Sequence, residues 1–128
     1  MAVTKIFAPG RKILEVEVDF HTTSTEHSVR VDISYPSGED RLLLSETHNK
    51  PSKITAHATI PAAGVILTVK TSNSATGDND DKFSRLTSSA TIESRDGGHK
   101  PGVGWPPGDG LTVKLKMLPL SNGFQKLS

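Results

Sequence analysis

Strict alternation of apolar and polar residues is the feature that most constrains what this chain can fold into. Between Ile13 and Phe20 the residues Leu14, Val16 and Val18 fall on the same side as Phe20, while acidic residues fill the positions between them. A period of two belongs to a β-strand, because successive side chains point to opposite faces. No window of helical length carries apolar residues at helical spacing together with a cap. The chain is therefore built from half-buried strands.

The same alternation recurs along the sequence at short intervals, bounded by Pro, Gly, Asn and Asp. The predicted strands cover residues 13–20, 28–35, 41–44, 53–60, 65–69, 86–93 and 111–117. Short alternating strands between turn residues are typical of an antiparallel sandwich. We predict an all-β antiparallel β-sandwich of about eight strands, forming one domain over residues 1–128 with a loosely held tail at 121–128.

The inward faces of these strands give the predicted core. Its members are Leu14, Val16, Val18, Phe20, Val29, Val31, Ile33, Ile54, Ile60, Val65, Leu67, Val69, Ile92, Leu111, Val113 and Leu115. A chain of 128 residues can bury roughly two-thirds of the surface that it exposes when unfolded, which is enough for a single core.

Charge and cysteine content exclude several classes of function. Fifteen basic residues against 14 acidic ones leave a net charge of +1, which argues against a protein whose main task is to bind nucleic acid or an anionic membrane. The absence of cysteine excludes disulfides, a thiolate zinc site and a thiol nucleophile.

The sequence shows no targeting or membrane signal. Pro9 and Gly10 interrupt the first residues before an apolar core of signal-peptide length can form. No stretch approaches the ~20 apolar residues of a membrane-spanning helix. We expect a cytoplasmic protein; release by lysis, or by a route that needs no signal peptide, is the alternative.

Segment 72–82 is the first candidate for chemistry, because carboxylate and amide side chains are concentrated in it. Calcium prefers six to eight oxygen ligands, and a loop rich in such side chains supplies several of them. The predicted metal ligands are Asn73, Asp78, Asp80 and Asp81. The helix–loop–helix calcium pattern is absent, and a solvated turn is the alternative interpretation.

Segment 95–110 is the second candidate, because it contains the sole tryptophan, Trp105, between prolines and glycines. An exposed indole offers a flat apolar face on which a sugar ring stacks, and Asp96, His99 and Asp109 stand nearby to orient hydroxyl groups. The alternative is that Trp105 closes one end of the core. Long loops in a compact domain are usually functional. Because segments 72–82 and 95–110 both fall between strands in the second half of the chain, we expect them to lie at one end of the sandwich.

The histidines give no metal or catalytic signature. Their spacing matches no zinc motif, and the sequence contains neither a nucleophile elbow nor a phosphate-binding loop. A Ser–His–Asp triad assembles in space rather than in sequence, so a small hydrolase with a dispersed active site remains the least favoured of our hypotheses.

The order of these elements resembles that of the calcium-dependent fucose/mannose-binding lectins of bacteria. The first strand runs into a polar turn, His21-Thr22-Thr23, and an acidic loop beginning at Asp96 leads through Asp109 into the final apolar strand. The resemblance implies a β-sandwich that binds sugars through calcium. Arg95 stands where a glutamate ligand is expected, so the metal-binding loop is matched poorly.

We therefore predict a non-enzymatic, lectin-like protein that binds glycans through its end loops and forms homo-oligomers. The predicted ligand-binding residues are His21, Thr22, Thr23, Asp96, His99, Trp105 and Asp109. Calcium is the one candidate cofactor. The alternative is a structural, assembly or toxin-associated oligomeric subunit without sugar binding, because free strand edges in a sandwich must be covered.

Overall fold

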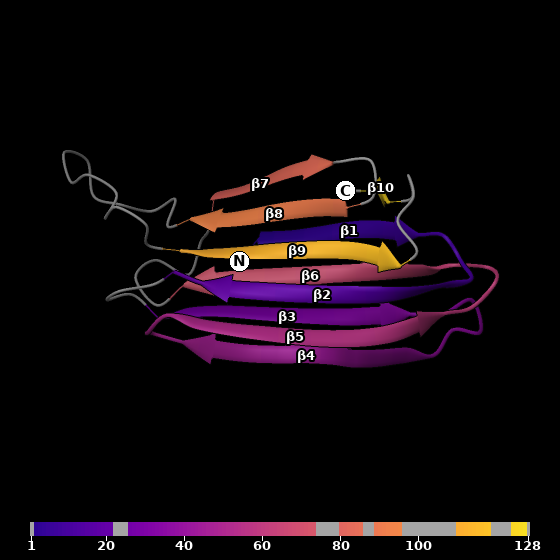
Figure 1. The fold of residues 1–128 in the computed structure, drawn as a ribbon, viewed down its shortest axis with the longest axis horizontal. Coiled ribbons are helices and arrows are strands. Elements are labelled where there is room, and N and C mark those ends of the chain that lie inside the picture. The colour runs from indigo at the N-terminus through magenta and orange to yellow at the C-terminus, as the bar shows by residue number, and fades with distance from the viewer. Residues whose placement is uncertain are drawn as a thin grey trace.

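Two antiparallel β-sheets packed face to face make up the described chain (Figure 1). The computed structural model describes residues 2–21, 26–73, 80–85, 89–95, 110–118 and 124–127. The strands are β1 (Ala2–Ala8), β2 (Lys12–Phe20), β3 (His27–Ser34), β4 (Asp40–His48), β5 (Ser52–Ile60), β6 (Val65–Asn73), β7 (Asp80–Arg85), β8 (Ser89–Arg95), β9 (Leu111–Leu118) and β10 (Gln125–Lys126). The predicted all-β antiparallel sandwich is confirmed.

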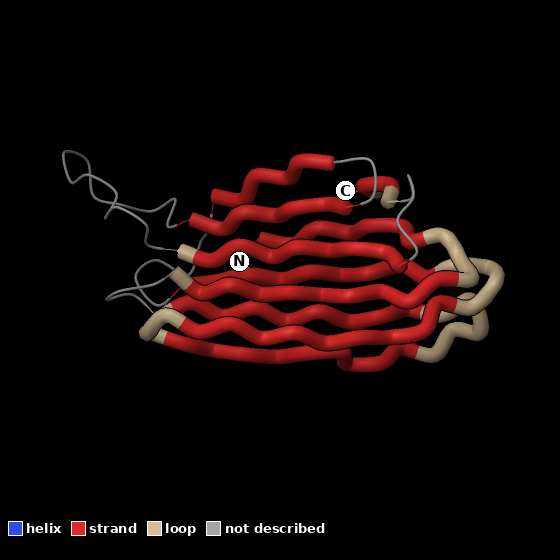
Figure 2. Tube along the Cα trace, in the orientation of Figure 1, coloured by secondary structure: helices blue, strands red, loops and turns tan. Residues whose placement is uncertain are grey.

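Each sheet has five strands. Sheet A has the order β10-β1-β6-β3-β4, and sheet B has the order β5-β2-β9-β8-β7. The described residues contain strands, turns and bends but no helix (Figure 2), and therefore no helix that is able to cross a bilayer. Strands β4 and β5 form edges on the same side of the sandwich (Figure 1).

The core lies between the sheets and follows the alternation of the strands. Of the predicted core residues, only Ile54 on the edge strand β5 is less than fully buried, and it packs against the cluster. The structure adds buried apolar side chains that the sequence analysis did not select: Ile6, Ala8, Leu44, Met117 and Phe124.

Charge pairing on the outer face of sheet B supports the strand register. Glu15, Glu17 and Asp19 of β2 project between basic residues of its two neighbours. The Glu17 carboxylate lies 2.7 Å from the Lys53 ammonium of β5, and Lys114 of β9 is its register partner on the other side. Opposite charges on neighbouring strands favour this register over a shifted one.

Several predicted boundaries are wrong. Segment 72–82 is not one continuous loop, because β6 continues to Asn73 and β7 begins at Asp80. Strand β4 extends well beyond the predicted 41–44, and a bulge opposite Val31 and Asp32 accommodates its leucine run. The described strands number ten rather than about eight, because β1, β7 and β10 were not predicted.

The predicted loose tail is also wrong for its described part, residues 124–127. Phe124 is 1% exposed in the core, and Gln125 and Lys126 pair with Phe7 and Ile6 of β1. The backbone N–H of Leu127 donates to the carbonyl oxygen of Lys5 at 2.7 Å. Burial of one aromatic ring and these hydrogen bonds hold the segment on sheet A.

Candidate functional site

The predicted site residues fall partly within the described chain. The structure describes His21 and Asn73 with their side chains, and Asp80 and Asp81 as the first residues of β7. The remaining candidates lie outside the described residues: Thr22, Thr23, Asp78, Asp96, His99, Trp105 and Asp109.

Strand register brings the boundaries of these segments to one end of the sandwich. In sheet B, Phe20 pairs with Leu111 and with Ser52, and Asp80 pairs with Arg95. In sheet A, His27 pairs with Asn73 and with His48. The ends of β2, β4, β6 and β8 and the starts of β3, β5, β7 and β9 therefore meet at this end (Figure 1).

We call this region the polar end. Its described side chains are His21, His27, Glu46, His48, Ser52, Asn73 and Thr112. Segments 22–25, 74–79 and 96–109 all begin and end here, as the expectation of a common end for the two long segments requires.

His21 is fixed at the junction between β2 and β9. Its backbone N–H donates to the Gly110 carbonyl oxygen at 2.9 Å, and its Nε2 lies 2.6 Å from Thr112 Oγ1. The ring is half-buried, and its contact with the threonine hydroxyl holds it in position. This geometry places an oriented polar ring beside the start of segment 22–25.

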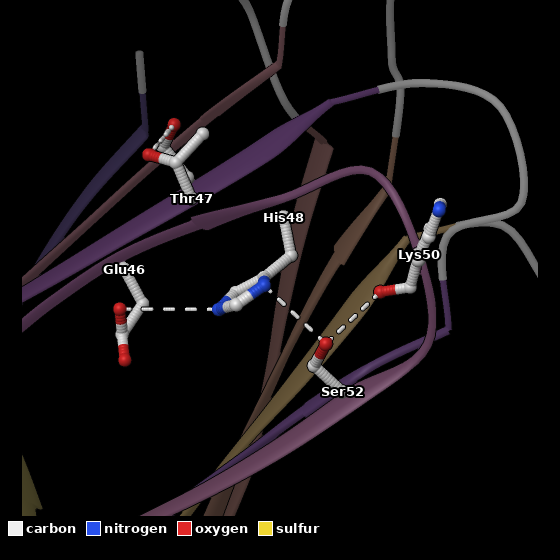
Figure 3. Close-up of polar contacts among 6 residues, drawn as sticks. Glu46, Thr47, His48, Lys50 and Ser52 are labelled. Carbon is white, nitrogen blue, oxygen red and sulfur yellow. Dashed lines mark hydrogen bonds and ion pairs between the residues drawn. The ribbon is translucent and has the colours of Figure 1, made fainter.

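A second histidine joins β4 to β5 (Figure 3). His48 Nδ1 lies 3.3 Å from Ser52 Oγ, while the Ser52 hydroxyl donates to the Lys50 carbonyl oxygen at 3.3 Å. Because the carbonyl can only accept, the single hydroxyl proton goes to it, and His48 Nδ1–H is then the donor to Ser52. The Phe20 ring meets His48 edge-on, with centroids 4.8 Å apart.

This arrangement does not favour a catalytic serine. A nucleophilic hydroxyl gives its proton to the histidine, whereas the proton of Ser52 is directed at Lys50 O. On the other side of the ring, Nε2 is buried without a hydrogen bond and lies 3.8 Å from Glu46 Oε2. The contact between His48 and Ser52 joins the end of β4 to the start of β5. The other ring nitrogen of His48 faces the Glu46 carboxylate.

Buried polar residues extend the site inward in sheet A. His27 is fully buried, and its register neighbour Asn73 is 6% exposed. Thr71, on the same strand as Asn73, is 1% exposed. Sequence reasoning missed His27 and His48 because only the strand register shows that they are neighbours at the end where the long segments begin.

The predicted calcium ligands lie at the two boundaries of segment 74–79, with Asp78 outside the described residues. Asn73 ends the central strand of sheet A in a buried position, whereas Asp80 and Asp81 begin the edge strand of sheet B. Among the described side chains, no group of three or more His, Asp or Glu residues is placed to hold a metal ion. The calcium site formed by Asn73 and the three aspartates therefore stays a prediction.

Two depressions on the outer face of sheet A are lined by described residues. One, of about 180 Å³, lies far from the polar end and is bordered by Phe7, Tyr35, Pro36 and Ile66. The other, of about 110 Å³, lies nearer the polar end and is lined by Ser28, Arg30, Ser45 and Lys70 among others.

Comparisons with known proteins give one structural match. No protein-family model matches the chain, and no curated protein does. The chain is similar to a lectin from Chromobacterium violaceum solved in complex with α-methyl-fucoside, at 18% identity and a TM-score of 0.49, over 91% of this chain and 96% of that one. This weak similarity assigns neither a function nor a site residue to the chain.

Proposed function

We propose that this protein is a non-enzymatic, lectin-like carbohydrate-binding module that uses the polar end. One observation carries the proposal: the register of both sheets gathers oriented polar side chains at the end where segments 22–25, 74–79 and 96–109 start and finish. A rigid β-scaffold that presents adjacent segments at one end is a common platform for recognition.

Within this proposal each residue type has a defined task. His21 and Thr112 supply fixed hydrogen-bonding groups for sugar hydroxyls. Trp105 provides the stacking face, while Asp96, His99 and Asp109 orient the ring, with Thr22 and Thr23 at the rim. These assignments outside His21 and Thr112 rest on the sequence pattern.

Absence of catalysis is part of the proposal. Its support is the direction of the Ser52 proton, which leaves the serine–histidine contact between Ser52 and His48 without an activated nucleophile. A hydrolase would be revealed by turnover of ester or glycoside substrates that falls in a Ser52→Ala variant.

Binding to a glycan array and titration with the sugars that it selects test the proposal directly. Trp105→Ala and His21→Ala should each weaken binding at least about tenfold, which corresponds to about 1.4 kcal/mol. His57→Ala is the matched control, because His57 lies on the outer face of sheet B with Glu15, far from the polar end. Failure to bind any glycan, with and without calcium, would contradict the proposal.

Calcium binding is a finer part of the same proposal, and Asn73, Asp78, Asp80 and Asp81 are its proposed ligands. A melting curve with calcium and with a chelator measures this, since a ligand at a hundred times its dissociation constant adds about 2.7 kcal/mol to a folded state. Replacement of Asp78 and Asp81 by Asn should abolish the difference. An unchanged difference in that double variant would exclude these ligands.

A homo-oligomer is supported by the edges of the sandwich. Strands β4 and β5 are both nine residues long and form neighbouring edges, and Ile54, Ala56 and Ala58 of β5 are only partly buried although they face the core. Such an edge is a template for a second copy of the chain. This observation also favours the second candidate function, an assembly subunit.

Sedimentation velocity distinguishes these states. A dimer of the unmodified chain should become a monomer in Thr55→Lys, which places a charge on the exposed edge, while Lys50→Gln beside the strand should leave the dimer intact. A monomeric unmodified chain at high concentration would remove both the oligomer and the assembly function.

A further inference from the structure

The middle of the outer face of sheet A groups basic residues that are only partly matched by carboxylates. Alternation along β1, β3 and β6 points Lys5, Arg30 and Lys70 outward near the middle of this face. We call these three residues the cationic strip. The outward residue on β3 beside Arg30 is Asp32, the single carboxylate in these rows.

Two members of the cationic strip face each other across neighbouring strands. Arg30 of β3 and Lys70 of β6 are direct register partners, and like charges in that position destabilise a sheet. Sheet B avoids this pattern, since Glu17 of its β2 faces Lys114 and contacts Lys53. The unfavourable pair in sheet A therefore calls for a physical explanation.

Only one of the two charges is compensated. Arg30 donates from Nε to Asp32 Oδ2 at 2.8 Å and from Nη2 to Oδ1 at 3.1 Å. This fork fixes the guanidinium and leaves Nη1 uncommitted. Within the described residues no carboxylate pairs with Lys70, although Lys70 is half-buried.

Space and hydroxyl groups are available at the same place. Lys70 and Arg30 line the depression of about 110 Å³ together with Ser28 and Ser45, and this volume exceeds the ~10–15 Å³ that a cavity needs to hold one water. The Ser28 hydroxyl contacts Thr47 Oγ1 at 2.9 Å, so part of the lining is already oriented. An ammonium, a fixed guanidinium and hydroxyl groups around a small depression are the donors that an oxyanion requires.

We propose that this depression binds the anionic group, sulfate or carboxylate, of an acidic oligosaccharide. The bound anion would supply the missing countercharge between Arg30 and Lys70 and so offset the repulsion between register partners. This site is separate from the polar end, and the inference does not depend on sugar binding there.

The test compares charge-matched variants on the two sheets. Calorimetric titration is carried out with a sulfated disaccharide, a uronic acid disaccharide, a neutral disaccharide and inorganic sulfate, at low and at physiological salt. Lys70→Gln and Arg30→Gln should weaken binding of the anionic probes about tenfold or more, the size expected for one charge-assisted hydrogen bond. Lys116→Gln on sheet B removes the same charge and should change binding less than about twofold.

The probes also show whether the bound anionic group is a sulfate or a carboxylate. They test the anion site independently of the proposed sugar site at the polar end. Preference for the sulfated over the uronic sugar, or the reverse, identifies the group, and either result supports the site. His21→Ala should leave binding of inorganic sulfate unchanged, so loss of the polar-end proposal would not affect this one. Equal losses in Lys70→Gln and Lys116→Gln, or equal binding of the neutral sugar, would overturn the inference.

A second measurement needs no sugar. Because Lys70→Gln removes a like-charge contact, it should raise the melting temperature at low salt, and added sulfate should stabilise the unmodified protein but not the variant. A lower melting temperature in Lys70→Gln, with sulfate stabilising both proteins equally, would also overturn the inference.

Discussion

Neighbouring residues of β6 experience opposite environments, which allows burial to be tested with almost no change of position. Leu67 is fully buried between the sheets, whereas Ile66 next to it is 38% exposed. Leu67→Ala should lower the free energy of unfolding by about 2–5 kcal/mol, because it removes packed methyl groups and leaves a cavity. Ile66→Ala should cost far less, and urea denaturation measures both. Similar losses would show that β6 is not buried on one face.

Gly64 illustrates a different residue-scale constraint, a turn that excludes a side chain. Its φ is +82°, and an added Cβ would lie 2.7 Å from both the Ala8 carbonyl oxygen and the Phe7 ring. Gly38 has a similar φ of +90° but open space around it. Both alanine variants incur the left-handed backbone penalty of about 1–2 kcal/mol. Gly64→Ala should be the more destabilising, because only its new Cβ would also clash with neighbouring atoms. Equal melting temperatures would contradict this close approach.

At the scale of elements, the short strand β10 secures the chain end. Phe124 is 1% exposed while Leu127, three residues later, is 46% exposed. Phe124→Ala should destabilise the fold by about 3–5 kcal/mol, and Leu127→Ala should have little effect. Thermal unfolding measures the contrast. A negligible effect of Phe124→Ala would mean that this segment is as loose as its sequence suggests.

The charge ladder of sheet B gives an acid-sensitive contribution to stability. The hydrogen bond from Lys53 is the main cause that holds the pKa of Glu17 below its ordinary value, with the nearby charges of Lys53 and Lys114 adding to it. Because the folded state binds this proton more weakly than the unfolded state does, the stabilisation is present above the ordinary pKa. It is lost as the pH falls through the folded value.

Lys53→Gln should therefore reduce the stability that the protein loses between pH 7 and pH 3. Urea midpoints at both pH values measure the loss, and Lys50→Gln is the control, since Lys50 lies in the turn between β4 and β5. The effect is small because Lys53 is largely exposed. Identical acid dependence in the two variants would show that the Glu17–Lys53 contact does not stabilise the fold.

Strands in which apolar and polar residues alternate strictly were predictable from the sequence. The strands that were missed lack this alternation. In β2 and β9 every second residue is apolar and buried. In β1 the pattern misleads, because Thr4 points inward while Val3 and Phe7 point outward.

Two further gaps have the same kind of cause. The sequence of β7 begins with two aspartates and has no apolar alternation, so only its pairing with β8 defines it as a strand. At the polar end, the contacts of His21 and His48 depend on register between strands distant in sequence, which no local pattern encodes.

At the scale of the whole molecule, the two sheets share one core but have different outer faces. Sheet B pairs acidic and basic side chains along its central strands, whereas sheet A leaves the cationic strip with one carboxylate. Strands of both sheets begin or end at the polar end. The scaffold thus separates the two proposed recognition surfaces, one at an end and one on a face, and the hydrophobic core lies between the sheets that carry them.

The topology of this scaffold also determines how fast it forms. Strand β1 pairs with β6 and with β10, and β2 pairs with β9, so both sheets depend on contacts between distant parts of the chain. The entropy of closing such large loops is lost before the contacts are gained. We expect the main refolding phase to have a relaxation time of milliseconds to seconds, as in other sandwiches rich in non-local pairing.

Stopped-flow far-UV circular dichroism after dilution from urea measures this phase. Slower phases of tens of seconds, caused by some of the eight prolines, should disappear when the chain is refolded after a very brief unfolding step, because proline isomers then have no time to equilibrate. The main phase should persist, since loop closure does not depend on proline state. A main phase in microseconds would mean that local contacts dominate, which the pairing of β2 with β9 does not allow.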